Sequence, residues 1–506
     1  MLRYSILTLT LVSTWSLDFV WGQDPALPKE VVQIEQAMQT AIADVEPSVV
    51  SIFVSRSDAY RKLFHDQPPE DSPGKLGSFN PRIASNSSGS STSDETVRKY
   101  DLADPEHVPE ASGSGVVIDG KELLVLTTYH LLRDATKIYV RLDRDRGSYA
   151  DIHAADPRSD LAVLRLLDEK LRPLKEIKFG DASAARKGQI VATVANPYAP
   201  GFRDGSPSAS WGIISNFRER AAEGPVEEDK QRALYLLATL LQTDAPLNRG
   251  SSGGALINLK GEMIGLTTSR AAVAGGETAG GLAVPIDANF KRIIGRLREG
   301  AEVEYGFLGV RWRPNAVRGQ GLWLEHVVAG SPADKAGLRI GDCLLSINGV
   351  PVKDESELLL TIAMLPPGSE ARVVVRDRAQ PINVTLAKHY VPGKAIVSKK
   401  VPDVRGLRVD YASVLCTQSE FGIQGPFQRR EVVQGVYVRE VQPGSRAAAA
   451  KLQVNDIITH VNDQKVDNPG DFYRAAARVS SNSPLEFMLI SFDWGRSYRS
   501  TKVVIP

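Results

Sequence analysis

The feature that most constrains this chain of 506 residues is an internal repeat in its C-terminal part. Residues 321–342 align without gaps with residues 435–456, at an offset of 114. Each copy has the pattern of a strand, a turn, a short alanine-rich helix and another strand, and a second helix follows (355–365 and 469–479). Two copies at this spacing indicate tandem globular domains, because solenoid repeats recur every ~20–50 residues.

The region from Gly113 to Arg298 consists mainly of short apolar runs separated by glycine, proline, asparagine and aspartate. Runs of this kind predict strands, and many short strands in succession predict an antiparallel sandwich or a pair of barrels. The amphipathic segment 287–297 predicts a helix that closes this unit near Gly300. The predicted strands are 115–118, 123–127, 137–142, 161–164, 189–194 and 263–267.

Composition narrows the classes of partner and of stabilisation. Lys+Arg 61 against Asp+Glu 60 gives a net charge of +1, which favours neither a nucleic acid nor an anionic membrane as partner. The two cysteines, Cys343 and Cys416, are far apart, so we expect no disulfide framework. Cysteine and histidine do not cluster with metal-ligand spacing, and we therefore expect no metal site and no cofactor.

The N-terminal residues 1–22 have the features of a secretory signal peptide. Arg3 precedes a short apolar region, and small or apolar residues allow cleavage before Gln23. Asp18 comes late in the apolar region, so an uncleaved anchor is the alternative. The segment is short for a spanning helix, and no other run of 18 apolar residues occurs. We expect a periplasmic or otherwise extracytoplasmic protein without a stable membrane span.

A long polar stretch interrupts the first part of the chain. It follows a helical pattern over 29–45 and a strand pattern over 48–54, and it extends over 55–111. Residues 86–93 are low in complexity and cannot bury enough apolar surface to order themselves. We interpret the stretch as a long mobile loop within a domain, because the strand pattern resumes after it. A linker between domains is the alternative.

The segment Gly250-Ser251-Ser252-Gly253-Gly254 has a pattern typical of a nucleophilic serine on a tight loop. Glycine adopts backbone angles that other residues resist. The amides of such a loop can point at the oxygen that becomes negative during acyl transfer. A surface turn rich in glycine and serine is the alternative, so the hypothesis requires a base and an orienting acid.

Among the seven histidines, His130 is the best candidate for the base. It follows an apolar run in the same predicted domain as Ser252. His153 shares that domain but has polar neighbours, whereas His65 and His107 lie in the polar stretch. The other three belong to the repeats. His130 is therefore the predicted general base.

Asp160 is the best candidate for the acid that orients this base. It opens the apolar run 161–164, where a carboxylate can be desolvated against a histidine. Asp134, Asp151 and Asp156 have more polar surroundings, and Asp156, which precedes a proline, is interpreted as a turn or capping residue. The chain order of base, acid and serine is that of the chymotrypsin-type enzymes.

Taken together, these motifs resemble the HtrA (DegP/DegS-like) serine proteases, and the repeats resemble PDZ domains. The resemblance implies a mainly β protein, with a chymotrypsin-like double β-barrel followed by two PDZ domains. The expected units are the protease domain (23–300), a first PDZ domain (301–390), a linker (391–403) and a second PDZ domain (404–506). The segments that carry the resemblance are 45–50, 113–118, 124–130, 156–164, 196–197, 243–256 and 281–285.

The family resemblance also implies roles for these residues. Ser252 attacks the peptide carbonyl, His130 carries the proton and Asp160 holds the imidazole. The amides of Gly250 and Ser252, with that of Ser251, form the oxyanion hole. The resemblance implies a small or medium aliphatic residue before the scissile bond.

Four positions depart from the family pattern. Ser251, Tyr129 and Thr267 each stand where the family has asparagine, and Ala255 stands where it has proline. A backbone amide at residue 251 survives the change of side chain. The shape of the specificity pocket and the anchoring of the loop are the properties that these departures put in question.

PDZ domains bind an extended peptide C-terminus by strand addition, and backbone amides hold its carboxylate. The residues that match this loop are Phe307, Leu308, Gly309 and Val310 in the first copy and Gly406, Leu407, Arg408 and Val409 in the second. Plain strand core is the alternative for Phe307 and Leu308. Because Arg408 takes the position of Gly309, we expect the second copy to bind peptides poorly and to serve assembly or packing.

The favoured function is an ATP-independent, extracytoplasmic endopeptidase that acts on unfolded or damaged proteins, with PDZ domains that bind peptide C-termini and regulate it. A non-catalytic PDZ scaffold or chaperone-like holdase, and a dedicated signalling protease activated by a peptide, are the alternatives. The resemblance further implies a homo-oligomer, a trimer or a multiple of it. Residues 197–211 and 269–281 are expected to be activation loops.

Overall fold

The computed structural model describes residues 28–57, 101–104, 109–197, 199, 205–218, 239–268, 280–313, 321–391, 395–417, 432–480, 483–492 and 498–505. The predicted signal peptide, most of the predicted long loop and much of both predicted activation loops lie outside the described residues. No helix within the described ranges is long and apolar enough to cross a membrane.

The first barrel is a closed antiparallel sheet of six strands, which the pairing of β5 with β6 completes. All residues of β1 and β3 are buried, because the apolar side chains of both strands pack into two separate hydrophobic clusters. The strands are β1 (Val49–Ser55), β2 (Ala111–Asp119), β3 (Leu124–Thr128), β4 (Lys137–Arg141), β5 (Gly147–Asp156) and β6 (Leu161–Leu166), in the order β5-β4-β1-β2-β3-β6.

The second barrel is also closed, by the pairing of β11 with β12. The short strand β7 (Lys178–Phe179) extends it in parallel to β12. Its six strands are β8 (Ile190–Ala195), β9 (Ser208–Arg218), β10 (Leu240–Thr243), β11 (Ala255–Ile257), β12 (Glu262–Thr268) and β13 (Gly281–Pro285). The double barrel confirms the predicted fold class.

One hydrophobic cluster joins the two barrels and the helices that flank them. It contains Val116 and Leu126 of the first barrel and Val194 and Leu266 of the second. The helices α1 (Lys29–Val45) and α5 (Ala288–Arg298) add their apolar faces to it. The predicted helix at 287–297 is thereby confirmed, and the Asp287 side chain caps it by accepting from the Phe290 amide.

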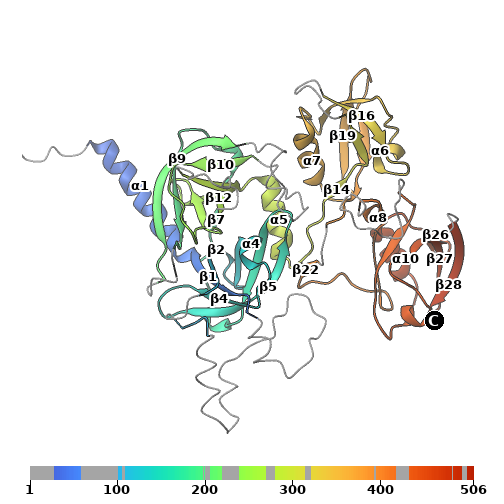
Figure 1. Ribbon diagram of the computed structural model, residues 1–506, viewed down its shortest axis with the longest axis horizontal. Coiled ribbons are helices and arrows are strands. Elements are labelled where there is room, and N and C mark those ends of the chain that lie inside the picture. Colours follow the sequence, from blue (N-terminus) through green and yellow to red (C-terminus); the bar gives the residue numbers. More distant parts are fainter. Residues whose placement is uncertain are drawn as a thin grey trace, which may run out of the picture.

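The two repeat copies share one topology, and Figure 1 shows both beyond α5 on the same side of the barrels. The first sheet has the order β15-β16-β17-β19-β20 and the second the order β23-β24-β25-β27-β28. The first copy comprises β14 (Gly306–Phe307), β15 (Val310–Trp312), β16 (Leu322–Val327), α6 (Pro332–Lys335), β17 (Cys343–Ile347), β18 (Val350–Pro351), α7 (Glu355–Ala363), β19 (Glu370–Val375), β20 (Ile382–Thr385) and β21 (Ala387–Lys388). The second comprises β23 (Leu407–Tyr411), α8 (Ser413–Thr417), β24 (Val436–Val441), α9 (Arg446–Ala449), β25 (Ile457–Val461), β26 (Gln464–Lys465), α10 (Pro469–Ala477), β27 (Leu485–Phe492) and β28 (Tyr498–Ile505).

The segment between the two copies contributes a strand to the first barrel. β22 (Ile396–Val397) pairs antiparallel with β5, so that Ile396 lies opposite Ala155 and Val397 opposite Ala154. Just beyond it, the Ser398 amide donates to the His153 carbonyl at 2.9 Å. The segment predicted as a linker is thus bound to the barrel over this stretch.

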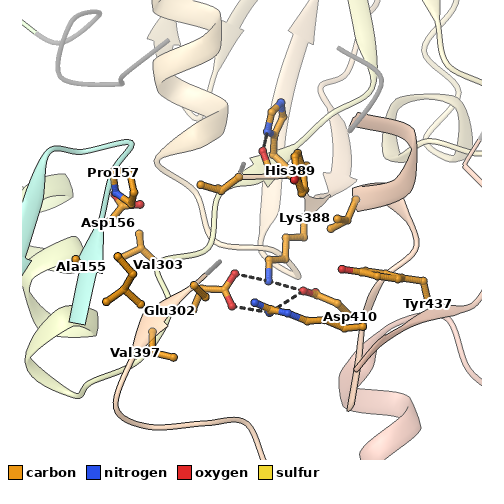
Figure 2. Close-up of a pocket in the computed structure, with 16 residues that line it drawn as sticks. Ala155, Asp156, Pro157, Glu302, Val303, Lys388, His389, Val397, Asp410 and Tyr437 are labelled. Carbon is orange, nitrogen blue, oxygen red and sulfur yellow. Dashed lines mark hydrogen bonds and ion pairs between the residues drawn. The ribbon is translucent and has the colours of Figure 1, made fainter. Parts of the chain in front are cut away.

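A buried cluster of charges joins both repeat copies to the chain that leaves the protease unit. Lys388, whose side chain is 4% exposed, lies within 3.2 Å of carboxylate oxygens of Glu302, Glu304 and Asp410. Arg439 contacts Glu302 and Asp410 at 2.6 and 3.1 Å, and a cavity of about 120 Å³ adjoins these groups (Figure 2). Despite burial, the two cations hold the pKa of Glu302 below its ordinary value.

Candidate active site

The pairing of β3 with β6 brings His130 and Asp160 together. Thr128 at the end of β3 lies opposite Leu161 at the start of β6. His130 follows β3 as the second residue of the short helix α4 (Tyr129–Leu132), and Asp160 immediately precedes β6. The strand ends therefore present the two side chains at the same place.

Asp160 holds His130 with both carboxylate oxygens. Oδ1 accepts the backbone amide of His130 at 2.8 Å, and Oδ2 lies 2.7 Å from the ring atom Nδ1. The Asp160 side chain is 3% exposed and that of His130 is 21% exposed. A carboxylate at this distance requires a proton on Nδ1, so in the neutral ring Nε2 is the atom that can accept one.

The backbone of Asp160 adopts an uncommon conformation. Its φ of +58° lies in the left-handed region, which aspartate tolerates better than most residues. Its carbonyl accepts the amide of Tyr129 at 2.8 Å, which ties the turn before β6 to α4. The conformation depends on these surrounding contacts, because strained residues persist only where the structure holds them.

The segment before the predicted nucleophile forms a tight turn from Asn248 to Ser251. The Ser251 amide donates to the Asn248 carbonyl at 3.0 Å, and Gly250 has a φ of +96°. A positive φ at the third position defines a type II turn and favours glycine there. The Ser251 hydroxyl accepts the Asn248 amide at 3.3 Å, so serine anchors this loop where asparagine was expected.

Two residues that sequence reasoning did not assign fasten this loop to both barrels. Ser114 in β2 donates its hydroxyl to the Gly250 carbonyl at 2.8 Å and its amide to the Ser252 carbonyl at 2.8 Å. Thr267 in β12 donates its hydroxyl to the Ser251 carbonyl at 2.5 Å. Ser114 stands between two glycines in a segment that the sequence singled out, which was the available signal.

Gly113 brings the loop and α4 into contact. A Cβ at this position would lie 2.4 Å from a methyl group of Leu131, the residue after His130, and 3.2 Å from the Ser252 carbonyl oxygen. Only a residue without a side chain lets the two segments approach this closely. Ser252 itself is buried, with 7% of its surface exposed. The structure therefore places Ser252 next to the His130 helix.

The competing candidates have other surroundings. His153 is buried, and its ring nitrogens lie 2.9 Å from the Ser398 hydroxyl and 3.1 Å from the Arg298 carbonyl. Burial lowers its pKa, and these contacts belong to the domain junction. Asp156 is a correction: it is 4% exposed rather than solvated, although it caps the Ser159 amide at 2.8 Å as its turn position suggested.

In the first repeat copy, the predicted carboxylate-binding loop connects β14 to β15. Phe307 and Leu308 are buried, and Gly309 has a φ of +88°. Within the described part of the chain, the amides of Leu308 and Gly309 have no hydrogen-bond partner. Two adjacent free amides in such a loop can donate to the oxygens of a carboxylate.

In the second copy, the structure shifts the predicted alignment by two residues. Gly406, not Arg408, is equivalent to Gly309: its φ is +86°, and a Cβ there would lie 2.2 Å from Ser445 Cβ, as one at Gly309 would from Ser331 Cβ. Strand pairing agrees, because Leu407 lies opposite Val441 as Val310 lies opposite Val327. Arg408 and Val409 consequently lie along β23, beyond the loop.

The loop of the second copy is engaged by its own side chains. The Gly406 amide donates to the Asp403 carboxylate at 2.7 Å. Arg408 reaches the Val401 carbonyl at 2.7 Å and a Glu440 oxygen at 2.8 Å, and it lies 3.7 Å from the second Asp403 oxygen. Sequence reasoning missed Asp403, whose only signal was an aspartate three residues before a glycine.

Family models match three parts of this chain, and relatives match most of its length. Residues 113–266 match the trypsin-like peptidase domain, and residues 324–377 and 414–486 each match the PDZ domain. The probable periplasmic serine endoprotease DegP-like of Brucella melitensis is 31% identical over 498 residues, which cover 92% of this chain and 90% of the relative. The periplasmic serine endoprotease DegP of Escherichia coli is 31% identical, with 71% of this chain and 70% of the relative covered. Among solved structures, the HtrA-type protease AlgW with tripeptide has a TM-score of 0.47 at 22% identity, with 70% of this chain and 98% of that chain covered.

Proposed function

Because this chain belongs to the HtrA (DegP-like) family of serine endoproteases, we propose that it degrades unfolded or damaged proteins outside the cytoplasm, without ATP. The observation that supports this most is the double hold of Asp160 on His130, at 2.8 and 2.7 Å, beside the Ser252 loop. Relatives described as periplasmic support the proposed compartment, with residues 1–22 as its signal peptide.

In the proposed reaction, Ser252 attacks the peptide carbonyl. His130 Nε2 takes the hydroxyl proton and later gives it to the leaving amine, and Asp160 stabilises the imidazolium that forms between the two steps. General-base action of this kind contributes about 10²–10⁴-fold in rate. The carboxylate oxygens of Asp160 remain acceptors throughout.

The proposed oxyanion hole consists of the amides of Gly250 and Ser252. The Gly250 amide has no partner among the described residues, whereas the Ser251 amide is committed to Asn248. In this conformation, Ser251 therefore supports the turn, and its neighbours supply the donors. Loss of one such donor typically costs about 2.7–4 kcal/mol of transition-state stabilisation.

The first PDZ domain is proposed to bind peptide C-termini through the amides of Leu308 and Gly309, with the peptide added as a strand. The second PDZ domain is proposed to pack against the rest of the molecule and not to bind peptides, because the Asp403 carboxylate already accepts the Gly406 amide. Occupation of the first domain by a substrate C-terminus would hold a client near Ser252. A homo-oligomer, a trimer or a multiple of it, is part of the proposal.

Labelling with a fluorophosphonate probe tests the catalytic proposal. We expect the purified full-length protein to be labelled and to cleave unfolded β-casein, and we expect Ser252→Ala to do neither. Ser251→Ala is the comparison variant: it removes one hydrogen bond of the turn and keeps the backbone amide, so it should reduce labelling and cleavage without abolishing either.

Each assay is repeated after incubation with a peptide that has a free apolar C-terminus. Activity that appears only with this peptide would favour a dedicated signalling protease. Absence of labelling and of cleavage under both conditions would refute the catalytic proposal.

A further inference from the structure

The turn that carries Asp160 is held by a second carboxylate, that of Asp156. Asp156 ends β5, and its Oδ2 accepts the amide of Ser159, the residue before Asp160, at 2.8 Å. The same oxygen accepts a short hydrogen bond from the Tyr305 hydroxyl. Asp156 is 4% exposed, and burial raises its pKa. One buried oxygen thus joins the turn to Tyr305.

Tyr305 comes from a different part of the molecule. It lies between α5 and β14, where the protease unit passes into the first PDZ domain, and it is fully buried. Its carbonyl accepts the amide of His389 at 2.8 Å, directly after β21. Its backbone therefore belongs to the first PDZ domain, while its hydroxyl reaches into the barrel.

A second contact holds the Tyr305 ring on the turn. The guanidinium of Arg158 lies 4.7 Å from the ring centre, in the arrangement of a cation–π contact. The same guanidinium lies 3.4 Å from His389 Nδ1. Because His389 Nδ1 also lies 2.7 Å from the Tyr390 carbonyl and donates to it, the contact that holds Arg158 is the one with the Tyr305 ring. Tyr305 therefore contacts the turn 156–160 at both Asp156 and Arg158.

We propose that Tyr305 is a positioning residue for catalysis, which fixes Asp160 through Asp156 and so couples the seating of the first PDZ domain to the geometry of His130. This inference rests on the proposed catalytic roles of His130 and Asp160.

The physical argument starts from the left-handed backbone of Asp160. A residue with a φ of +58° keeps that conformation only where its neighbours enforce it, and the Asp156–Ser159 hydrogen bond is the nearest such constraint. Without the Tyr305 hydroxyl, the Asp156 oxygen loses a donor in a buried site, and the turn gains freedom. A smaller fraction of the molecules then keeps both hydrogen bonds between Asp160 and His130, the one to the backbone amide and the one to Nδ1. Tyr305 has no exposed surface and cannot touch substrate, so this change acts on kcat and not on KM.

The test compares three variants of the full-length protein with a quenched fluorescent peptide as substrate. Active sites are first titrated with the fluorophosphonate, so that turnover is expressed per labelled Ser252. Loss of one hydrogen bond predicts that Tyr305→Phe lowers kcat per titrated site about 3- to 10-fold, with KM changed less than about 2-fold. Asp156→Ala should lower it at least as far. Asp156→Asn should restore most of the turnover, because the amide oxygen can still accept from Ser159 and Tyr305.

Tyr437→Phe is the matched control, because Tyr437 is also a buried tyrosine at the domain junction but has no hydrogen bond to Asp156 within the described residues. It should keep wild-type kcat. The inference is overturned if Tyr305→Phe turns over at the wild-type rate per titrated site, or if Tyr437→Phe loses as much. It is also overturned if Asp156→Asn is as slow as Asp156→Ala. A wild-type protein that is never labelled refutes the catalytic proposal itself, which distinguishes the two failures.

Discussion

The two PDZ domains share a backbone and differ in what occupies their carboxylate-binding loops. Gly309 and Gly406 have nearly the same φ, +88° and +86°, and the same close approach to a serine. Yet the Gly309 amide has no partner in the described chain, whereas the Gly406 amide is bound to Asp403. The residue of the first domain that is equivalent to Asp403 is Gly306, which has no carboxylate. A loop shape shared by both domains therefore does not imply that both loops are available to a peptide.

The second domain contacts the rest of the molecule through its strand β23. Asp410 in β23 accepts from Lys388 at 2.7 Å and from Arg439 at 3.1 Å, inside the buried charge cluster. The equivalent position in the first domain is Arg313, just past β15, whose side chain is exposed. In an open PDZ domain this strand receives the peptide. The comparison thus contrasts a strand left for a ligand with a strand engaged by the rest of the molecule.

The largest effect is expected from Lys388→Met, which removes the central cation and leaves carboxylates buried around a neutral side chain. Removal of one partner from a buried ion pair typically costs about 3–5 kcal/mol. We expect the second domain to separate from the junction, so that small-angle scattering reports a larger radius and trypsin cleaves the 391–403 segment faster. Lys465→Met removes only an exposed pair at 3.9 Å and should leave both measurements unchanged. An unaltered radius in Lys388→Met would show that the cluster does not hold the domain.

An intermediate effect is expected from Gly309→Ala. Its Cβ would lie 2.2 Å from Ser331 Cβ, at a φ that alanine resists. A backbone strain of about 1–3 kcal/mol predicts a loss of peptide affinity of about 10- to 100-fold. Fluorescence polarisation of a labelled peptide with a free apolar C-terminus measures it, in the Ser252→Ala background to prevent cleavage.

The control for this substitution is Gly349→Ala. Gly349 has a φ of +81° in the same domain, but a Cβ there would meet no atom within 4 Å. It carries a similar backbone strain away from the loop, so peptide affinity should be retained. Equal affinity in Gly309→Ala and Gly349→Ala would contradict the assignment of the first loop as the peptide site.

The smallest effect is a gain, in Asp403→Ala. With Gly309→Ala and Ser252→Ala also present, the first domain binds the peptide only weakly and the protease does not cleave it. Binding gained over this background therefore belongs to the second domain. Release of one amide is worth about 0.5–1.5 kcal/mol, so we expect weak but measurable binding, up to about 10-fold above background. Asp467→Ala removes an exposed carboxylate of the same domain and should add none. No gain would show that other groups block peptide binding, such as Tyr473, whose hydroxyl accepts the amide of Val409 in the adjoining strand β23 at 3.4 Å.

Local patterns were enough to predict the short strands, the repeats and the residues now found together at His130 and Asp160. They left a sandwich or a pair of barrels open, and the family resemblance predicted the double barrel. The roles proposed for them, with Ser252, stay predictions until the labelling is done. The two-residue error at Arg408 has a physical origin. Side chains alternate with a period of two along a strand, so a shift of two keeps the apolar pattern intact. The position of Gly406 against Ser445 and the pairing of Leu407 with Val441 resolved it.

The contacts that sequence reasoning missed join residues far apart in the chain. Tyr305 meets Asp156 across 149 positions, and Ser114 meets Gly250 across 136. Neither pair has a spacing or a motif that announces it, because each depends on how whole domains pack. Asp156 looked like a solvated turn residue for the same reason: what buries it comes from the next domain.

The strand β22 has a consequence for how this protein avoids unwanted association. By pairing with Ala154 and Ala155, it covers a stretch of β5 whose backbone donors and acceptors would otherwise face outward. Exposed strand edges of this kind recruit strands from other chains and start aggregation. If the proposed function is correct, unfolded polypeptides would present such strands to this protein continually. The segment between the two PDZ domains therefore also covers this edge of the barrel. Any movement of the second PDZ domain that separates β22 from β5 would expose the edge to other chains.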